Sequence, residues 1–203
     1  MVPARSRFHG DERPLASAVL ERVVLCEPEA MDVFFNHFYD RVYAHVVNML
    51  RDPILGQDLT QEIFLRLHRT VKQLDPQRDP AGWVFTVATN VIRDHWRSRE
   101  HKRGERELIV EDQEQLKAIH PDPDVQSVME RDEELQAVWT ALQSLREADR
   151  EVILLRDYEE LPTAKIADML EIAPEAVRQR HSRAVVRLGE LFRELDTSGS
   201  MES

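Results

Sequence analysis

Apolar side chains recur at three- and four-residue intervals along most of this 203-residue chain, and that interval is the period of one face of an α-helix. One such series is Phe34, Phe35, Phe38, Tyr39, Val42, Tyr43, Val46, Val47 and Leu50. Strand-like alternation is rare, and the whole chain has six glycines for the turns that a sandwich or barrel would require. The sequence therefore predicts an all-α fold.

Prolines and one acidic stretch divide the helical pattern. Asp52-Pro53 should end the first long helix, because proline lacks an N–H and biases its predecessor away from helical geometry. The prolines and charged residues of the segment 75–80 predict an exposed loop. Residues 104–134 carry 3 basic and 11 acidic side chains with weak periodicity, which predicts a flexible tether. We expect an N-terminal extension at 1–14, a helical domain at 15–104, an acidic linker at 105–130, a second helical domain at 131–196 and a disordered tail at 197–203.

Each predicted helix has an apolar face for the core. After the proline break this face consists of Leu59, Ile63, Phe64, Leu67 and Val71. Beyond the loop it consists of Trp83, Val84, Val87, Ala88, Val91 and Ile92, with Trp83 expected to anchor the loop. After the tether it consists of Leu135, Val138, Trp139, Leu142 and Leu145, and then of Val152, Ile153, Leu154 and Leu155.

Composition excludes several classes of protein. No apolar run approaches the roughly 20 residues of a membrane span, and the N-terminus has no apolar core of a signal peptide, so we expect no membrane insertion. The single cysteine, Cys26, fits a reducing cytoplasm. No glycine-rich phosphate loop, no metal-spaced His/Cys set and no nucleophile motif is present, so we expect no enzyme activity, no cofactor and no metal.

Residues 161–188 have the pattern of a helix-turn-helix. The first helix should end near Leu170, Glu171 to Ala173 should form the turn, and Pro174 should take the first helical position of the second helix. At 100° per residue, Val177, Ala184 and Leu188 face the core. The side chains left for DNA are Arg178, Gln179 and Ser182 on the outer face, Arg183 at its edge, and Arg180 and Arg187 in a flanking stripe. A solvated charged helix in an ordinary bundle is the alternative.

Two further stretches resemble a known family. The motif of 58–67 followed by that of 81–97 resembles region two of the extracytoplasmic-function group of sigma factors, the promoter-recognition subunits of bacterial RNA polymerase. The matching residues are Asp58, Leu59, Gln61, Glu62, Phe64, Trp83, Ala88, Asn90, Asp94 and Arg97. Leu154 to Asp157, Ile166-Ala167 and Ala176 to Arg178 are similar to region four, so the resemblance covers about 15–195.

The resemblance implies partners and sites. Core RNA polymerase would be bound through its clamp coiled coil and its flap, promoter DNA would be read at two elements, and an anti-sigma protein would hold the chain until a stress or envelope signal arrives. Polymerase contacts are expected at Asp58, Gln61, Glu62 and Arg66. Contacts to the minus-ten element are expected at Asn90, Arg93, Asp94, Arg97 and Arg99, and to the minus-thirty-five element at Arg178, Gln179, Arg180, Ser182, Arg183 and Arg187.

The chain departs from the family pattern around the helix-turn-helix. Glu160 and Pro162 stand where the family usually has glycine and serine, Glu171 replaces the turn glycine, and Ala173 replaces a serine N-cap. The promoter sequence therefore cannot be inferred from relatives. A dimeric helix-turn-helix regulator with an N-terminal helical sensor domain remains the alternative, although it gives no reason for the pattern at Asp58 to Glu62.

Overall fold

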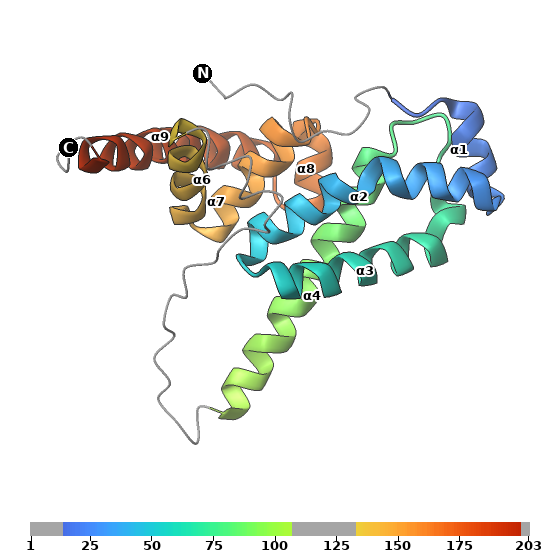
Figure 1. Ribbon diagram of the computed structural model, residues 1–203, viewed down its shortest axis with the longest axis horizontal. Coiled ribbons are helices and arrows are strands. Elements are labelled where there is room, and N and C mark those ends of the chain that lie inside the picture. The colour runs from blue at the N-terminus through green and yellow to red at the C-terminus, as the bar shows by residue number, and fades with distance from the viewer. Residues whose placement is uncertain (1–13, 107–132, 200–203) are drawn as a thin grey trace. The chain divides into compact units, whose positions relative to one another are not determined.

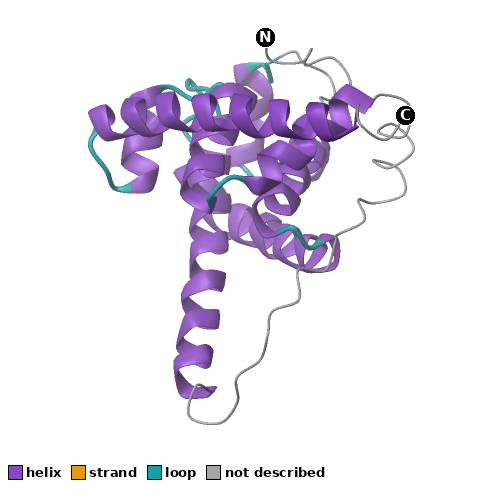
Figure 2. Ribbon diagram, turned by 90° about the vertical axis from the view of Figure 1, so that its left-hand side faces the viewer, coloured by secondary structure: helices purple, strands orange, loops and turns teal. Residues whose placement is uncertain are grey.

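The computed structural model describes residues 14–106 and 133–199, and every regular element in these ranges is helical (Figures 1 and 2). The elements belong to two compact units. The N-terminal unit contains α1 (Ser17–Val24), α2 (Pro28–Leu50), α3 (Pro53–Thr70), a 3₁₀ turn (Val71–Gln73) and α4 (Ala81–Arg106). The C-terminal unit contains α6 (Glu133–Ser144), α7 (Glu147–Ile153), a π-helical segment (Leu154–Tyr158), α8 (Thr163–Leu170) and α9 (Pro174–Gly199). The predicted all-α, two-domain fold is confirmed.

Three predicted segments lie mainly outside the described residues. They are the N-terminal extension at 1–14, the acidic linker at 105–130 and the tail at 197–203. The domain bounds given from the sequence therefore remain predictions.

The core of the N-terminal unit lies where α2 packs against α1, α3 and α4. The predicted series on α2 contributes Phe34, Phe38, Val42 and Val46, all buried. On α4, Trp83 is half-buried with its ring centroid 6.3 Å from that of Phe34. Phe85, which the predicted face omitted, is fully buried. Because α4 packs against both α2 and α3, it buries a wider face than the periodicity indicates.

The Asp52-Pro53 break is confirmed, and it starts the next helix as well as ending the previous one. Arg51 takes a left-handed conformation after α2, with φ at 58°. Asp52 then caps α3, since its Oδ1 accepts hydrogen bonds from the backbone N–H groups of Ile54 and Leu55. Pro53 takes the first turn, where its missing N–H is not needed.

The C-terminal unit is built around the first half of α9. Val177 and Ala184 are fully buried, and Ala184 forms a cluster with Leu145 and Ile153, against which Leu188 packs. The core face predicted for the second helix of the helix-turn-helix is therefore confirmed. The helix-turn-helix bounds are confirmed too, since α8 ends at Leu170 and α9 begins at Pro174.

Two glutamates with a left-handed backbone conformation lie on either side of α8. Glu160 and Glu171 have φ of 57° and 56°, in the left-handed region that favours glycine. Both stand where the family pattern has glycine. Pro162 precedes α8 with no side-chain cap, so this helix begins without the hydrogen bond that a serine would supply.

Candidate nucleic-acid interface

The outer face of α9 is exposed as predicted. Arg178, Gln179 and Ser182 are all exposed on it. The Arg178 guanidinium is held by the Glu175 carboxylate at 2.6 Å, one helical turn earlier. Since both side chains are more than half exposed, this pair is screened by water and leaves the arginine able to exchange partners.

The cationic flank of α9 consists of Arg180, Arg183 and Arg187. Arg183 and Arg187 are exposed and Arg180 is half-buried. Arg187 pairs with Glu190 at 3.0 Å and lies 3.8 Å from Glu194. The three cations therefore lie along one side of the helix, beside the exposed face that carries Arg178, Gln179 and Ser182; the sequence analysis placed Arg180 and Arg187 in this stripe and Arg183 at the edge of the outer face.

The back of α9 is fixed by contacts that the sequence analysis did not find. His181 Nε2 lies 2.7 Å from Asp157 Oδ2, which belongs to the π-helical segment. Arg156 of the same segment hydrogen-bonds to Thr163, the first residue of α8. These contacts tie both helices of the helix-turn-helix to one segment. A π-helical turn places successive side chains differently from an α-helix, so periodicity alone could not find this arrangement.

The face of α3 carries the residues predicted to bind polymerase. Asp58 and Gln61 are exposed, and Glu62 is half-exposed one turn after Asp58. The opposite face buries Leu59, Ile63 and Leu67 in the core. The polar group and the core face thus occupy opposite sides of one helix, as the sequence predicted.

Arg66 connects this face to α4. Its guanidinium donates to Glu62 at 2.6 Å on the same helix and to Asp94 at 2.9 Å on α4. The hydrogen bond to Asp94, followed by that to Glu62, raises the pKa of Arg66. Asp94 also lies 3.6 Å from Arg97. One residue predicted for polymerase and one predicted for DNA therefore bind each other.

The remaining residues predicted for the minus-ten element lie on α4. Asn90, Arg97 and Arg99 are exposed, whereas Arg93 is half-buried. They fall within a stretch of α4 that contains no acidic residue except Asp94.

The loop before α4 is braced by its own carboxylates. Asp75 accepts the backbone N–H of Gln77, and Asp79 accepts that of Ala81. The side-chain amide of Gln77 also donates to Glu21 on α1 at 3.2 Å. These hydrogen bonds hold the loop to α1 and to the start of α4. The two prolines of the loop, Pro76 and Pro80, favour this conformation.

The described part of the chain contains neither a membrane-spanning helix nor a cluster of metal ligands. No helix there is long and apolar enough to cross a membrane. No cluster of three or more His, Cys, Asp or Glu side chains there could hold a metal ion.

Comparison with known proteins identifies both units. Residues 34–102 match the family model of sigma-70 region 2, and residues 135–188 match that of sigma-70 region 4. The chain is 26% identical over 169 residues to the RNA polymerase sigma-H factor of Pseudomonas aeruginosa, covering 82% of this chain and 88% of that protein. It is 29% identical over 167 residues to the ECF RNA polymerase sigma factor SigK of Mycolicibacterium vanbaalenii, covering 80% and 82%.

Solved structures share the fold. The sigma factor RpoE, in its co-crystal structure with the anti-sigma factor NepR from Bartonella quintana, has a TM-score of 0.63 at 20% identity, covering 80% of this chain and 96% of that one. CnrH, in complex with the cytosolic domain of CnrY, has a TM-score of 0.59 at 18% identity, covering 88% and 97%. At these identities the likeness supports the fold alone.

The two matched regions together span more than half of the chain. They coincide with the two structural units and follow the order that the sequence motifs predicted. The chain therefore belongs to the sigma-70 family of RNA polymerase sigma factors, and within that family to the extracytoplasmic-function group.

Proposed function

We propose that this chain binds core RNA polymerase through α3 and directs initiation at promoters that α4 and α9 recognise. The observation that carries the proposal is the pairing of a region 2 unit and a region 4 unit in one chain, each with its predicted functional face exposed. Such a protein is an initiation factor rather than an enzyme, and it works where the polymerase works, in the cytoplasm.

The polymerase contact is assigned to Asp58, Gln61 and Glu62. Asp58 and Gln61 are exposed, so a partner reaches both without any rearrangement of the core. Two carboxylates one turn apart suit a partner helix with basic side chains. Arg66 is assigned a positioning role, because it is already engaged by Glu62 and Asp94.

The minus-ten contact is assigned to Asn90, Arg93, Arg97 and Arg99. An exposed amide suits hydrogen bonding to a base edge, and guanidinium groups suit phosphates. Asp94 is assigned to positioning, because a bare carboxylate repels phosphate while this one is engaged by Arg66 and Arg97. Asp94→Ala should therefore weaken polymerase binding as well as promoter opening, since it releases Arg66. An effect on DNA alone would contradict this role.

The minus-thirty-five contact is assigned to the outer face and cationic flank of α9. Residues 135–203 carry 9 basic and 13 acidic side chains, so the domain as a whole attracts DNA poorly. Its binding therefore depends on the polymerase, which holds it near the promoter while α4 contacts a second element. Arg178→Ala should weaken promoter selection by the holoenzyme and leave polymerase docking intact.

We also propose an anti-sigma partner. The two solved structures with the same fold are described as a sigma factor bound to the anti-sigma factor NepR and as CnrH bound to the cytosolic domain of CnrY. A protein that covers the α3 face or the α9 face would block polymerase or promoter binding by this chain. Purification of the chain from its native cells without any stoichiometric inhibitor, under uninduced conditions, would argue against this partner.

Run-off transcription tests the main proposal. Core polymerase should produce defined transcripts from a set of genomic fragments only when the chain is added. Asp58→Asn should reduce this activity and the affinity for core polymerase together, whereas Asp32→Asn, an exposed carboxylate on α2, serves as the matched control. If no fragment gives a chain-dependent transcript, the proposal is wrong. If no transcript depends on the chain, and the chain dimerises and binds DNA without polymerase, the alternative of a dimeric helix-turn-helix regulator is favoured.

A further inference from the structure

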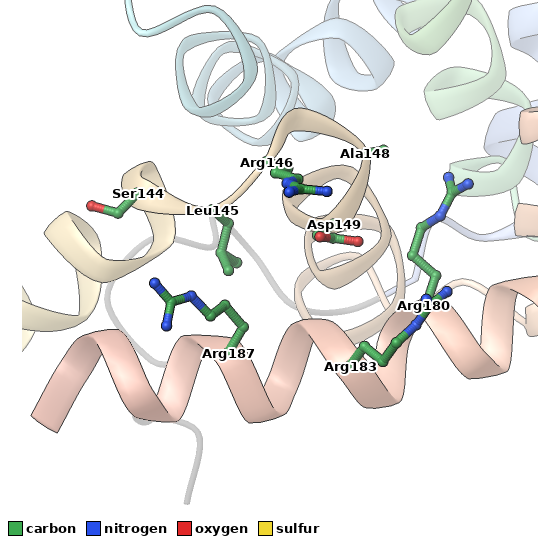
Figure 3. Close-up of a pocket in the computed structure, with 8 residues that line it drawn as sticks. All are labelled: Ser144, Leu145, Arg146, Ala148, Asp149, Arg180, Arg183 and Arg187. Carbon is green, nitrogen blue, oxygen red and sulfur yellow. The ribbon is translucent and has the colours of Figure 1, made fainter.

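A hollow of about 600 Å³ lies between α9 and the turn that joins α6 to α7. Figure 3 shows the arginines of α9 along one side and Arg146 and Asp149 on the other. Its lining consists of Ser144, Leu145, Arg146, Ala148, Asp149, Arg180, Arg183 and Arg187. Four arginines and one aspartate therefore line a space wide enough for a hydrated phosphate.

The charge in this hollow is only partly neutralised. Arg187 is paired with Glu190. Arg183 donates through Nε to the backbone oxygen of Gln179 at 3.3 Å, which leaves its terminal amino groups for another acceptor. Among the described residues, Arg146 and Arg180 form no ion pair. An anion would thus meet two guanidinium groups, those of Arg146 and Arg180, that no carboxylate in the described part of the chain pairs, and Asp149 is the one carboxylate in the lining.

The position of the hollow suits the backbone of a bound duplex. Arg180, Arg183 and Arg187 follow one another at i, i+3 and i+7, which places them along one flank of α9. Arg183 lies where this flank meets the exposed face that carries Gln179 and Ser182. When that face enters a major groove, its flank runs beside the bordering phosphates.

We propose that the hollow binds a phosphate of the promoter backbone, and that Arg146 of the α6–α7 turn is a DNA-contacting residue outside the helix-turn-helix. This inference rests on the proposed function and extends its minus-thirty-five site. Arg146 and the flank of α9 hold the phosphate from two sides, which fixes how deeply and at what angle the helix lies in the groove. Arg146 carries no base specificity of its own.

The test is the salt dependence of holoenzyme binding to a promoter fragment found by run-off transcription. Arg146→Gln should make the negative slope of log affinity against log salt shallower by about 0.9, the value for one lost phosphate contact. Affinity should fall by a similar factor on every promoter, so that their ranking stays the same. Arg146→Lys should keep the slope. Arg193→Gln, an exposed arginine of α9 outside the hollow, is the matched control.

A free phosphate ion could bind the hollow through the same chemistry as a DNA phosphate. Inorganic phosphate and pyrophosphate are the probes that distinguish these two ligands. If either ion stabilises the full chain at micromolar concentration through Arg146, while the salt slope of Arg146→Gln equals that of the wild type, the hollow is a site for a free anion and the DNA assignment is wrong. An unchanged slope without anion binding also overturns the proposal. Wild-type initiation in the same assay shows that only this inference, and not the proposed function, has failed.

Discussion

His45 lies toward the C-terminal end of α2 with 1% of its surface exposed, and its ring centroid is 5.2 Å from that of Phe85 in an edge-on contact. Among the described residues neither ring nitrogen has a hydrogen-bond partner. Burial therefore disfavours the imidazolium and lowers the pKa of His45 from 6.5 to about 4. This makes the stability of the N-terminal unit depend on pH.

The direction and size of the effect follow from that shift. Because the folded state keeps His45 neutral, its stability is complete above pH 6.5 and falls as the unfolded chain takes up a proton between pH 6.5 and about 4. One pKa unit corresponds to about 1.4 kcal/mol, so the full loss is about 3 kcal/mol. From pH 7.5 to pH 5.0 it amounts to about 2 kcal/mol.

Urea unfolding at a series of pH values measures this. Trp83 and Trp96 lie in the N-terminal unit and Trp139 in the other, so tryptophan fluorescence in a Trp139→Phe background reports the N-terminal unit alone. His45→Leu removes the titration at similar side-chain volume. The difference in unfolding free energy between the two proteins should change by about 2 kcal/mol between pH 7.5 and 5.0. A difference that stays constant across this range would show that His45 is not held neutral by burial.

Three further changes test particular contacts. Gly56→Ala should lower the unfolding free energy of the N-terminal unit by roughly 1–2 kcal/mol, because the new Cβ would lie 2.6 Å from a valine methyl of α2. Gly189→Ala is the control: it has open space around it and should raise stability slightly. Glu171→Gly should stabilise the C-terminal unit by about 0.5 kcal/mol and Glu171→Val destabilise it by more than about 1 kcal/mol, as judged by urea midpoints. Asp157→Ala should cost about 1 kcal/mol by removing the acceptor of His181, and an unchanged melting temperature would contradict this.

The sequence was sufficient to predict most of the helices, because their signals are local. Apolar spacing, the Asp52-Pro53 break and Pro174 at a helix start each act within a few residues, and the structure confirms all three. Phe85 was missed because its burial depends on two neighbouring helices, and not on the helix that carries it.

The same division applies to the candidate site. Which face of α9 points outward could be predicted from one helix, as Arg178 and Gln179 show. The bond between Arg66 and Asp94 joins residues 28 positions apart, and that between His181 and Asp157 joins residues 24 positions apart. Such pairs depend on how helices cross, so a single sequence without the tertiary arrangement could not reveal them.

The left-handed glutamates beside α8 show that a turn of this kind can form without glycine. A side chain in this conformation costs roughly 1–2 kcal/mol, but replacing glycine also stiffens the unfolded chain, which returns about 0.4–1 kcal/mol. On balance the exchange of glycine for glutamate at Glu160 and Glu171 therefore costs about 0.5–1 kcal/mol, a small part of the stability of a domain. At both positions this chain keeps a positive φ although the residue is glutamate and not glycine. A motif that demands glycine will overlook helix-turn-helix units whose backbone follows the same path.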